Sequence, residues 1–227
     1  YGEIWGTKLM RVTDENSPYY GKLLLNEAGL PQSTGVSEKI GDQQADCMLG
    51  WNNSFRYKNF ALSFQIDGRL GGDIYSYTNY ALQIAGRAEC TAPGGMREDF
   101  VVDGVIRQQD GSYAPSTIKV SQQDYWQAIG TGNTGIGEAN IYDATNIRLR
   151  NIALNYSFPS SMLKKTIFQQ LKLGFSINNV WMIYSDMNGI DPEAVFITNT
   201  NATGFENCAS PTSRSYSVSY THLRAHE

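Results

Sequence analysis

The stretch Trp51–Arg69, WNNSFRYKNFALSFQIDGR, decides the fold of this 227-residue chain. Its two halves alternate between apolar and polar residues, and only Lys58-Asn59 separates them. Alternation with a period of two predicts two β-strands in a tight antiparallel hairpin, apolar on one face and polar on the other. Such a hairpin fits a half-buried soluble sheet, and it equally fits a membrane barrel whose apolar face meets lipid. The apolar face consists of Trp51, Phe55, Tyr57, Phe60, Leu62, Phe64 and Ile66.

Composition excludes several classes of protein. The formal net charge is −4 and no basic run occurs, which argues against nucleic acid as a partner. No stretch of eighteen apolar residues occurs, so we expect no transmembrane helix. The three cysteines, Cys47, Cys90 and Cys208, form no CxxC motif, so zinc and thioredoxin chemistry have no support. Their odd number predicts at least one free thiol.

Further strands are expected along the chain. The alternation slips by one residue near Asn151, and such a slip predicts a β-bulge. A short helical turn is expected at Gln122–Ile129, inside a long polar region. The expected strands are Ile4–Val12, Phe100–Ile106, Ile147–Phe158, Leu171–Ile177 and a last one from about Arg214.

The lengths of the connections discriminate between the two β architectures. Long segments at 13–46, 71–146 and 185–213 alternate with short ones at 58–59 and 159–170. Outer-membrane barrels alternate long extracellular loops with short periplasmic turns in this way. The pattern therefore favours a barrel over a soluble sandwich.

Several motifs between about residues 40 and 217 together resemble the SusC/RagA family of TonB-dependent outer-membrane transporters. Each motif is short, and their order along the chain makes the set specific. They are Ile40-Gly41-Asp42, the hairpin, Gly68–Ser76 (GRLGGDIYS), Ala144–Asn151 (ATNIRLRN), Gly189–Glu193 (GIDPE) and Pro211–Tyr216 (PTSRSY).

The resemblance implies an all-β fold: about six C-terminal strands of an antiparallel transmembrane β-barrel, with long extracellular loops. It implies the outer membrane of a Gram-negative bacterium, and import of glycans or other oligomeric nutrients such as peptides. The implied partners are a SusD-like surface lipoprotein, TonB acting through an N-terminal region, and outer-membrane lipid. The chain opens at Tyr1 without a methionine, and we expect it to be part of a longer receptor.

The last ten residues depart from the family pattern, which ends its final strand in an aromatic residue. We therefore expect residues 1–217 to be the barrel segment and 218–227, VSYTHLRAHE, to be a non-native tail derived from a sequencing adapter. Both histidines, His222 and His226, lie in this tail. Their spacing of four suggests a metal pair on a helix, but the adapter origin is the preferred interpretation.

No catalytic constellation is evident, so we expect neither an enzyme, nor a cofactor, nor a metal site. Four residues are candidates for substrate contact. Tyr125 and Trp126 offer rings that stack on a sugar or pack a loop onto the rim. Arg148 and Arg150 alternate with apolar residues and should point into the lumen, where they line the substrate path or pair with Asp67 or Asp73 to hold the wall. The carboxylates of Asp191 and Glu193 fit a turn cap better than acid–base chemistry.

Trp51, Trp181 and Tyr184 are expected at the outer rim, as an aromatic girdle. The alternative function is that of a soluble β-sandwich that binds carbohydrate. The direction of the apolar faces separates the two hypotheses: outward on one curved sheet, or inward between two sheets.

Overall fold

The computed structural model describes residues 2–132, 135–164, 166–187, 189–195 and 202–224. They belong to two compact units. Unit 1 comprises residues 1–44, 73–142 and 195–209, and unit 2 comprises residues 45–72, 143–194 and 210–227.

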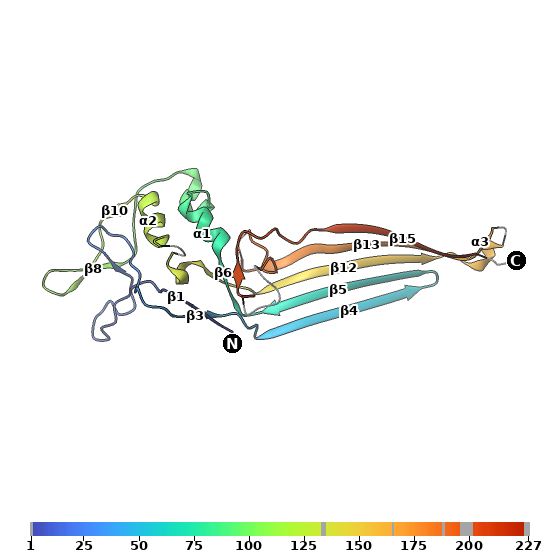
Figure 1. Cartoon of the computed structure of the whole chain (residues 1–227), viewed down its shortest axis with the longest axis horizontal. Coiled ribbons are helices and arrows are strands. Elements are labelled where there is room, and N and C mark those ends of the chain that lie inside the picture. Colours follow the sequence, from blue (N-terminus) through green and yellow to red (C-terminus); the bar gives the residue numbers. More distant parts are fainter. Residues whose placement is uncertain (1, 133–134, 165, 188, 196–201, 225–227) are drawn as a thin grey trace. The chain divides into compact units, whose positions relative to one another are not determined.

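Unit 2 is built on one five-stranded sheet, hereafter the long sheet (Figure 1). Its strand order is β15-β13-β12-β5-β4, and every neighbouring pair is antiparallel. A short helix, α3 (Ser160–Leu163), lies in the connection between β12 and β13. The strands are β4 (Cys47–Tyr57), β5 (Phe60–Leu70), β12 (Asn146–Ser157), β13 (Phe168–Ser185) and β15 (Ser215–Arg224).

The predicted hairpin is confirmed as β4 and β5, with Tyr57 opposite Phe60 across the two-residue link. Lys58 adopts a φ of 52° in this link, which tightens the turn. We call this end of the long sheet, with the links 58–59 and 158–167, the turn end. The opposite end, which carries residues 186–194 and 210–214, is called the loop end.

Strand register places apolar side chains in rows that run across the whole long sheet. Opposed pairs connect Tyr57, Phe60, Tyr156, Leu173 and Tyr220 in one such row. Tyr57 and Tyr220, at the two ends of this row, are 70% and 71% exposed. The apolar face is therefore continuous and uncovered by the described residues of unit 2.

The opposite face of the long sheet is made of small and polar side chains. One of its rows runs through Ser54, Ser63, Ala153, Ser176 and Ser217. The next row toward the loop end has Asn and Gln in most positions. The sequence thus specifies one apolar and one polar surface on every strand.

The predicted bulge near Asn151 is confirmed. The register of β12 against both neighbours shifts between Leu149 and Asn151, so that Arg150 is the extra residue. A matching irregularity follows in β13, where Asn179 has a φ of 51°. The bulges restore the apolar rows beyond the slip, since Leu149 again lies opposite Ile66 and Trp181.

Two adjacent glycines end strand β5. Gly71 and Gly72 have φ values of 73° and 84°, which favour glycine. A Cβ on Gly71 would lie 2.2 Å from the Asp46 carboxylate, and the Gly71 amide donates to Thr145 Oγ1 at 2.8 Å. The motif glycines therefore bring three segments of unit 2 together where the chain leaves the sheet.

Unit 1 consists of short elements around a small apolar core. Leu25, Val102 and Val120 form the core, and Phe100 and Tyr125 pack against it. The helices are α1 (Tyr77–Ile84), α2 (Gln122–Ile129) and the 3-10 turns η1 (Glu89–Thr91), η2 (Pro93–Gly95) and η3 (Gly137–Asn140). The strands are β1 (Glu3–Gly6), β2 (Leu24–Leu25), β3 (Glu38–Asp42), β6 (Asp73–Ser76), β7 (Phe100–Val101), β8 (Val105–Arg107), β9 (Tyr113–Pro115), β10 (Lys119–Val120), β11 (Ile141–Asp143) and β14 (Phe205–Glu206).

Serine caps start both helices of unit 1. Ser76 accepts from the Asn79 amide at 3.2 Å, and Ser121 accepts from the Asp124 amide at 3.1 Å. Glu206, only 2% exposed, accepts from Ser76 Oγ at 2.8 Å and from the Thr78 amide at 3.2 Å. A carboxylate at the N-terminus of α1 complements the helix dipole and fixes the 205–209 segment there.

Several expectations differ from the structure. Phe100–Ile106 forms two short strands, β7 and β8, instead of one. The Ile4–Val12 strand is limited to β1, which pairs with β3 and does not join the long sheet. Among the described residues the long sheet has five strands, where about six were expected. The three long polar segments supply most of unit 1, and apolar residues of the first two segments meet in its core.

In the described part of the chain, no helix has the length and apolar character needed to cross a membrane. The three cysteines are free and exposed. His222 lies in β15 opposite Leu171, and His226 lies outside the described residues. That residues 218–227 are a non-native tail stays a prediction.

Candidate functional site

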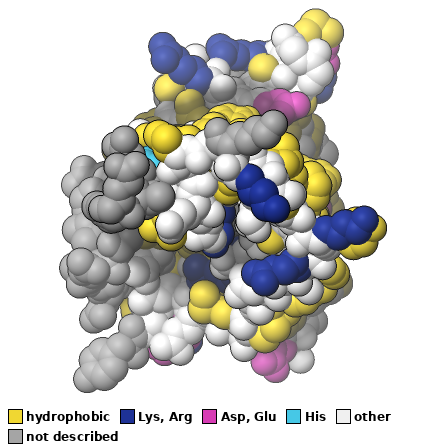
Figure 2. All heavy atoms as spheres, turned by 90° about the vertical axis from the view of Figure 1, so that its right-hand side faces the viewer, with side chains coloured by type: hydrophobic (Ala, Val, Ile, Leu, Met, Phe, Trp, Pro, Cys, Tyr) yellow, Lys and Arg dark blue, Asp and Glu magenta, His cyan; other side chains and the backbone are white. Residues whose placement is uncertain are grey.

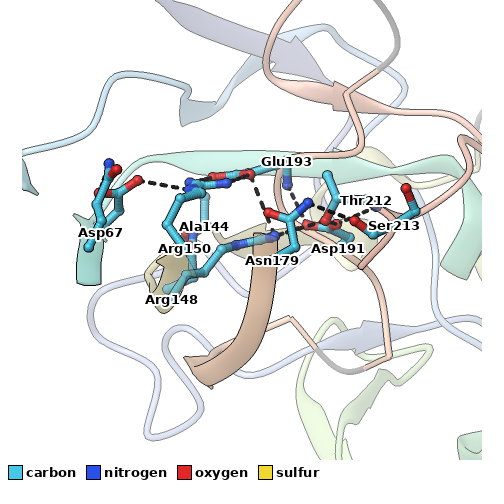
Figure 3. A network of polar contacts seen from close by, with 11 residues as sticks. Asp67, Ala144, Arg148, Arg150, Asn179, Asp191, Glu193, Thr212 and Ser213 are labelled. Atoms are coloured by element: carbon cyan, nitrogen blue, oxygen red, sulfur yellow. Dashed lines mark hydrogen bonds and ion pairs between the residues drawn. The ribbon is translucent and has the colours of Figure 1, made fainter. Parts of the chain in front are cut away.

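The polar face of β12 carries two arginines at the loop end of the long sheet. Arg148 lies opposite Asp67 of β5, and Arg150 is the extra residue of the bulge, directly before Asn151. Residues two apart on a strand share a face, so both long cationic side chains can reach the same carboxylate, that of Glu193. Figure 3 shows both reaching toward the segment 191–193.

Arg148 is the buried member of the pair. It is 5% exposed and forms an ion pair with Asp191, which is itself buried. Its Nη1 also donates to Thr212 Oγ1 at 3.0 Å and lies 3.5 Å from Glu193 Oε2. A buried guanidinium needs such partners, because leaving it unpaired in a dry environment costs several kcal/mol.

Arg150 is half-buried and connects the sheet to the same segment. Its Nη1 and Nη2 donate to the two carboxylate oxygens of Glu193 at 2.7 and 2.6 Å (Figure 3). Its Nε donates to Asp67 Oδ2 at 2.8 Å. The side chain thus bridges two carboxylates in the forked geometry that suits arginine.

Asp191 joins three segments of unit 2. Besides Arg148, it accepts from the Thr212 amide at 2.9 Å and from the Glu193 amide at 3.0 Å. Burial alone would raise the pKa of the Asp191 carboxyl, but hydrogen bonds from Arg148 and Thr212 outweigh it and hold the pKa well below its usual range. Asp191 is therefore ionised at every physiological pH.

A groove of about 410 Å³ lies beside this network. Arg148 and Asp191 line it together with Asn179, Trp181 and Arg214. The Arg148 Nε is buried and has no hydrogen-bond partner among the described side chains and backbone. The groove therefore offers the Trp181 ring, the Asn179 amide, the Arg214 guanidinium and the free Nε–H of Arg148 to a polar ligand.

The two aromatic candidates lie in unit 1, on α2. Tyr125 packs against Phe100, with ring centroids 5.2 Å apart, and belongs to the apolar core. Trp126 lines a separate pocket of about 260 Å³ and donates from Nε1 to Gln122 Oε1 at 3.2 Å. The same pocket is lined by Gln83, Gln123 and Gln127. Only Trp126 of this pair faces a cavity.

The structure brings the two arginines together and shows partners that sequence reasoning had only partly named. Asp67 pairs with Arg150, as considered, whereas Asp73 accepts from the Asp42 amide at 2.8 Å in unit 1. Asp191 does cap its turn, yet it also pairs with Arg148. The ion pairs of Asp191 and Glu193 were missed. One feature of the sequence could have indicated these ion pairs: Asp191 and Glu193 both lie in GIDPE, one of the motifs that carry the resemblance.

Comparison with known proteins identifies relatives along most of the chain. It is 30% identical over 169 residues to TonB-dependent receptor P3 of Formosa agariphila, which covers 74% of this chain and 15% of that protein. It is 32% identical over 156 residues to TonB-dependent receptor P39 of the same organism, covering 68% of this chain and 14% of that protein. The chain thus spans about one-seventh of the length of these curated relatives. No family model matches the chain.

Solved structures share its fold. The RagAB peptide transporter matches with a TM-score of 0.55 and 13% identity, over 96% of this chain and 22% of that chain. The RagAB peptide importer in its open-open state matches with a TM-score of 0.52 and 12% identity over the same shares. Because the sequence identity is only 12–13%, this similarity is evidence for a shared fold alone. Together with the sequence relatives it confirms the resemblance found from the motifs.

Proposed function

The chain belongs to the SusC/RagA-like TonB-dependent receptors, and from that premise we propose that it forms part of the wall of an outer-membrane nutrient importer. The long sheet would be a run of adjacent transmembrane strands. Its two edge strands, β4 and β15, would pair with further strands of the receptor.

One observation carries this proposal: the long sheet has a continuous exposed apolar face and a small, polar opposite face. A barrel wall in a bilayer has this composition, with lipid outside and water inside. Aromatic residues mark both ends of the apolar face, with Trp51 and Trp181 toward the loop end and Tyr57 and Phe60 at the turn end. Two such girdles match the two interfaces of a membrane.

The alternative, a soluble carbohydrate-binding sandwich, requires a second sheet packed on the apolar face. Within the described residues of unit 2 there is one sheet, and Trp51, Phe55 and Trp181 on its apolar face are more than half exposed. These observations favour the barrel.

The direction of the sheet follows from its connections. Short links at the turn end are expected on the periplasmic side, and the loop end is expected outside the cell. In this orientation unit 1, built from long loops, would take part in substrate capture and in contact with a SusD-like lipoprotein. TonB would act through parts of the receptor that precede this chain.

The arginine network is proposed to hold the wall and the loops in register at the outer rim. Arg148 and Arg150 engage three carboxylates, those of Asp67, Asp191 and Glu193, so both cationic charges are compensated within the wall. The groove beside Arg148 leaves room for a polar group of the substrate. In unit 1, Trp126 and the surrounding glutamines suit a neutral oligosaccharide or peptide, because amides donate and accept and the indole stacks.

Uptake of labelled oligosaccharides and peptides tests the proposal in a strain whose only copy of the receptor is supplied on a plasmid. We expect uptake of at least one class, and its loss when TonB is deleted. Trp126→Ala should reduce that uptake several-fold, whereas Trp5→Ala, which removes an exposed tryptophan of the same unit that lines neither this pocket nor the groove, serves as the control. Uptake that persists without TonB would rule out the proposed function.

A further inference from the structure

Basic residues without acidic neighbours gather at the turn end of the long sheet. No Asp or Glu occurs between residues 47 and 66 or between 144 and 185. Apart from the paired Arg148 and Arg150, these two acid-free segments hold five cations. The structure describes four of them, namely Arg56, Lys58, Lys164 and Lys172.

These four cations have exposed side chains and form no ion pair with any carboxylate that the structure describes. Exposed cations without an internal counter-ion keep their solvation and stay available to an external anion. Figure 2 looks onto this end and shows Lys and Arg side chains standing among hydrophobic ones.

The cations divide between the two faces of the sheet. Arg56 and Lys172 lie in register with Ala61 and Ser157, on the polar face. Lys58 lies in the hairpin turn, with its Nζ 5.3 Å from the centre of the Tyr57 ring, and Tyr57 belongs to the apolar face. The ammonium of Lys58 is therefore on the apolar side.

Lys164 follows α3 in the neighbouring link of the same end. The two links adjoin, because Asn59 Nδ2 donates to Ser157 O and the Ser157 amide donates to Asn59 O at 2.9 Å. Met162 and Ile167, on either side of Lys164, are 60% and 59% exposed. Lys58 and Lys164 thus combine a free ammonium with uncovered apolar neighbours.

Aromatic rings lie at the strand ends next to the two links. Phe60 and Tyr156 contact each other across β5 and β12, with centroids 4.7 Å apart, and Tyr156 contacts Phe158 at 4.9 Å. An ammonium placed just beyond an aromatic and aliphatic band is the arrangement by which lysines reach lipid headgroups while their stems rest on apolar surface.

We propose that Lys58 and Lys164 bind the phosphate groups of anionic phospholipids in the leaflet that meets the turn end. This inference rests on the proposed function, since only a sheet embedded in a membrane meets lipid. The apolar band would contact acyl chains, and the two ammonium groups would select phosphatidylglycerol-like headgroups over zwitterionic ones by charge. A soluble acidic partner would leave the contiguous apolar band uncovered, which favours lipid as the occupant.

The full receptor in nanodiscs that contain equal amounts of phosphatidylglycerol and phosphatidylcholine tests this proposal. Native mass spectrometry measures which lipid stays bound. We expect phosphatidylglycerol to be enriched on the wild type, and K58Q/K164Q to reduce that enrichment about fivefold or more. R56Q/K172Q is the matched control, because it removes the same charge from the same end on the polar face, and it should leave the enrichment unchanged.

Equal enrichment in all three proteins, or an equal loss in the control, would overturn the proposal. If K58Q/K164Q assembles poorly, the wild-type receptor is measured in 0.5 M NaCl instead. Salt screens the attraction between the two ammonium groups and the lipid phosphates, so the enrichment of phosphatidylglycerol should fall. An unchanged enrichment would refute the proposal. Failure of the proposed function would look different, since the receptor would then not insert into the discs at all.

Discussion

The charged side chains at the two ends of the long sheet differ in burial and in pairing. At the loop end, Arg148 and Arg150 are buried or half-buried, and each binds two carboxylates. At the turn end, Lys58 and Lys164 are exposed and have no carboxylate partner in the described structure. Both ends belong to the same strands, so the difference lies in what surrounds each end.

At the two ends of the sheet, the buried cations are paired with carboxylates and the exposed cations are not. Removing a guanidinium from water is so costly that Arg148 requires Asp191 and Thr212. An exposed ammonium loses little solvation, so Lys58 needs no internal partner and remains available to an external anion. The loop end is therefore a structural junction, and the exposed cations of the turn end fit the contact surface proposed above.

Loss of the buried cation should have the largest effect on stability. Arg148→Ala leaves the Asp191 carboxylate buried with Thr212 as its remaining side-chain donor, and we expect a loss of about 3–5 kcal/mol in the free energy of unfolding. Urea titration of the full receptor in vesicles, followed by tryptophan fluorescence, measures it.

The double variant R148M/D191L is the control for this effect. Replacing both charges with apolar groups should cost much less than removing one, because no unpaired charge is left behind. A cost of Arg148→Ala below about 1 kcal/mol would show that the network is solvated, and would remove the difference between the two ends.

Between the two ends, the two faces of the long sheet should differ in how much an introduced arginine destabilises the receptor. Ile152 lies in the central apolar row, opposite Phe64 and Ile177, and Ala153 is its neighbour on the polar face. Ile152→Arg should destabilise the membrane-inserted receptor by about 2–4 kcal/mol, whereas Ala153→Arg should have a small effect. The same urea titration compares them, and equal effects would contradict an outward apolar face.

The loop end should also respond to acid. The pKa of Asp191 is lowered in the folded state, so its ion pair contributes stability in full above the ordinary aspartate pKa of about 4. That contribution is lost as the pH falls below about 4 toward the lowered value. Wild type and D191N should therefore differ in urea midpoint at pH 7, and the difference should shrink as the pH falls from 4 toward 2; a difference that does not depend on pH would be inconsistent with this assignment.

The smallest effect is expected at the turn end. K58Q/K164Q should change the free energy of unfolding by less than about 0.5 kcal/mol, because exposed cations without partners contribute little to stability. Urea titration in uncharged phosphatidylcholine vesicles checks this. A loss of more than about 1 kcal/mol would reveal an internal partner and would erase the contrast with the loop end.

Much of the long sheet could be predicted from sequence because its alternation is local. The hairpin and the bulge at Asn151 both follow from periodicity within a dozen residues. Unit 1 could not be predicted in this way, because its core joins Leu25 to Val102 and Val120, far apart in sequence, and its strands are mostly two or three residues long.

The candidate site was predictable in part for the same reason. The two arginines stood out because they interrupt an apolar strand, and Asp67 of β5 was one of the two acidic partners expected for them. The pairs with Asp191 and Glu193 depend on how the loop after β13 folds back, which alternation does not encode. Tyr125 and Trp126 looked equivalent in sequence, and only the packing of α2 separates a core ring from one that faces a pocket.

The central claim is that the apolar face of the long sheet meets lipid and the polar face meets water. Single cysteines at Leu62, Ser63, Phe64 and Gln65, in a full receptor without its native cysteines, test it most directly. A water-soluble maleimide should label positions 63 and 65 and spare 62 and 64, while a lipid-soluble maleimide should label 62 and 64. Equal aqueous labelling at all four positions, or the reverse pattern, would contradict the account.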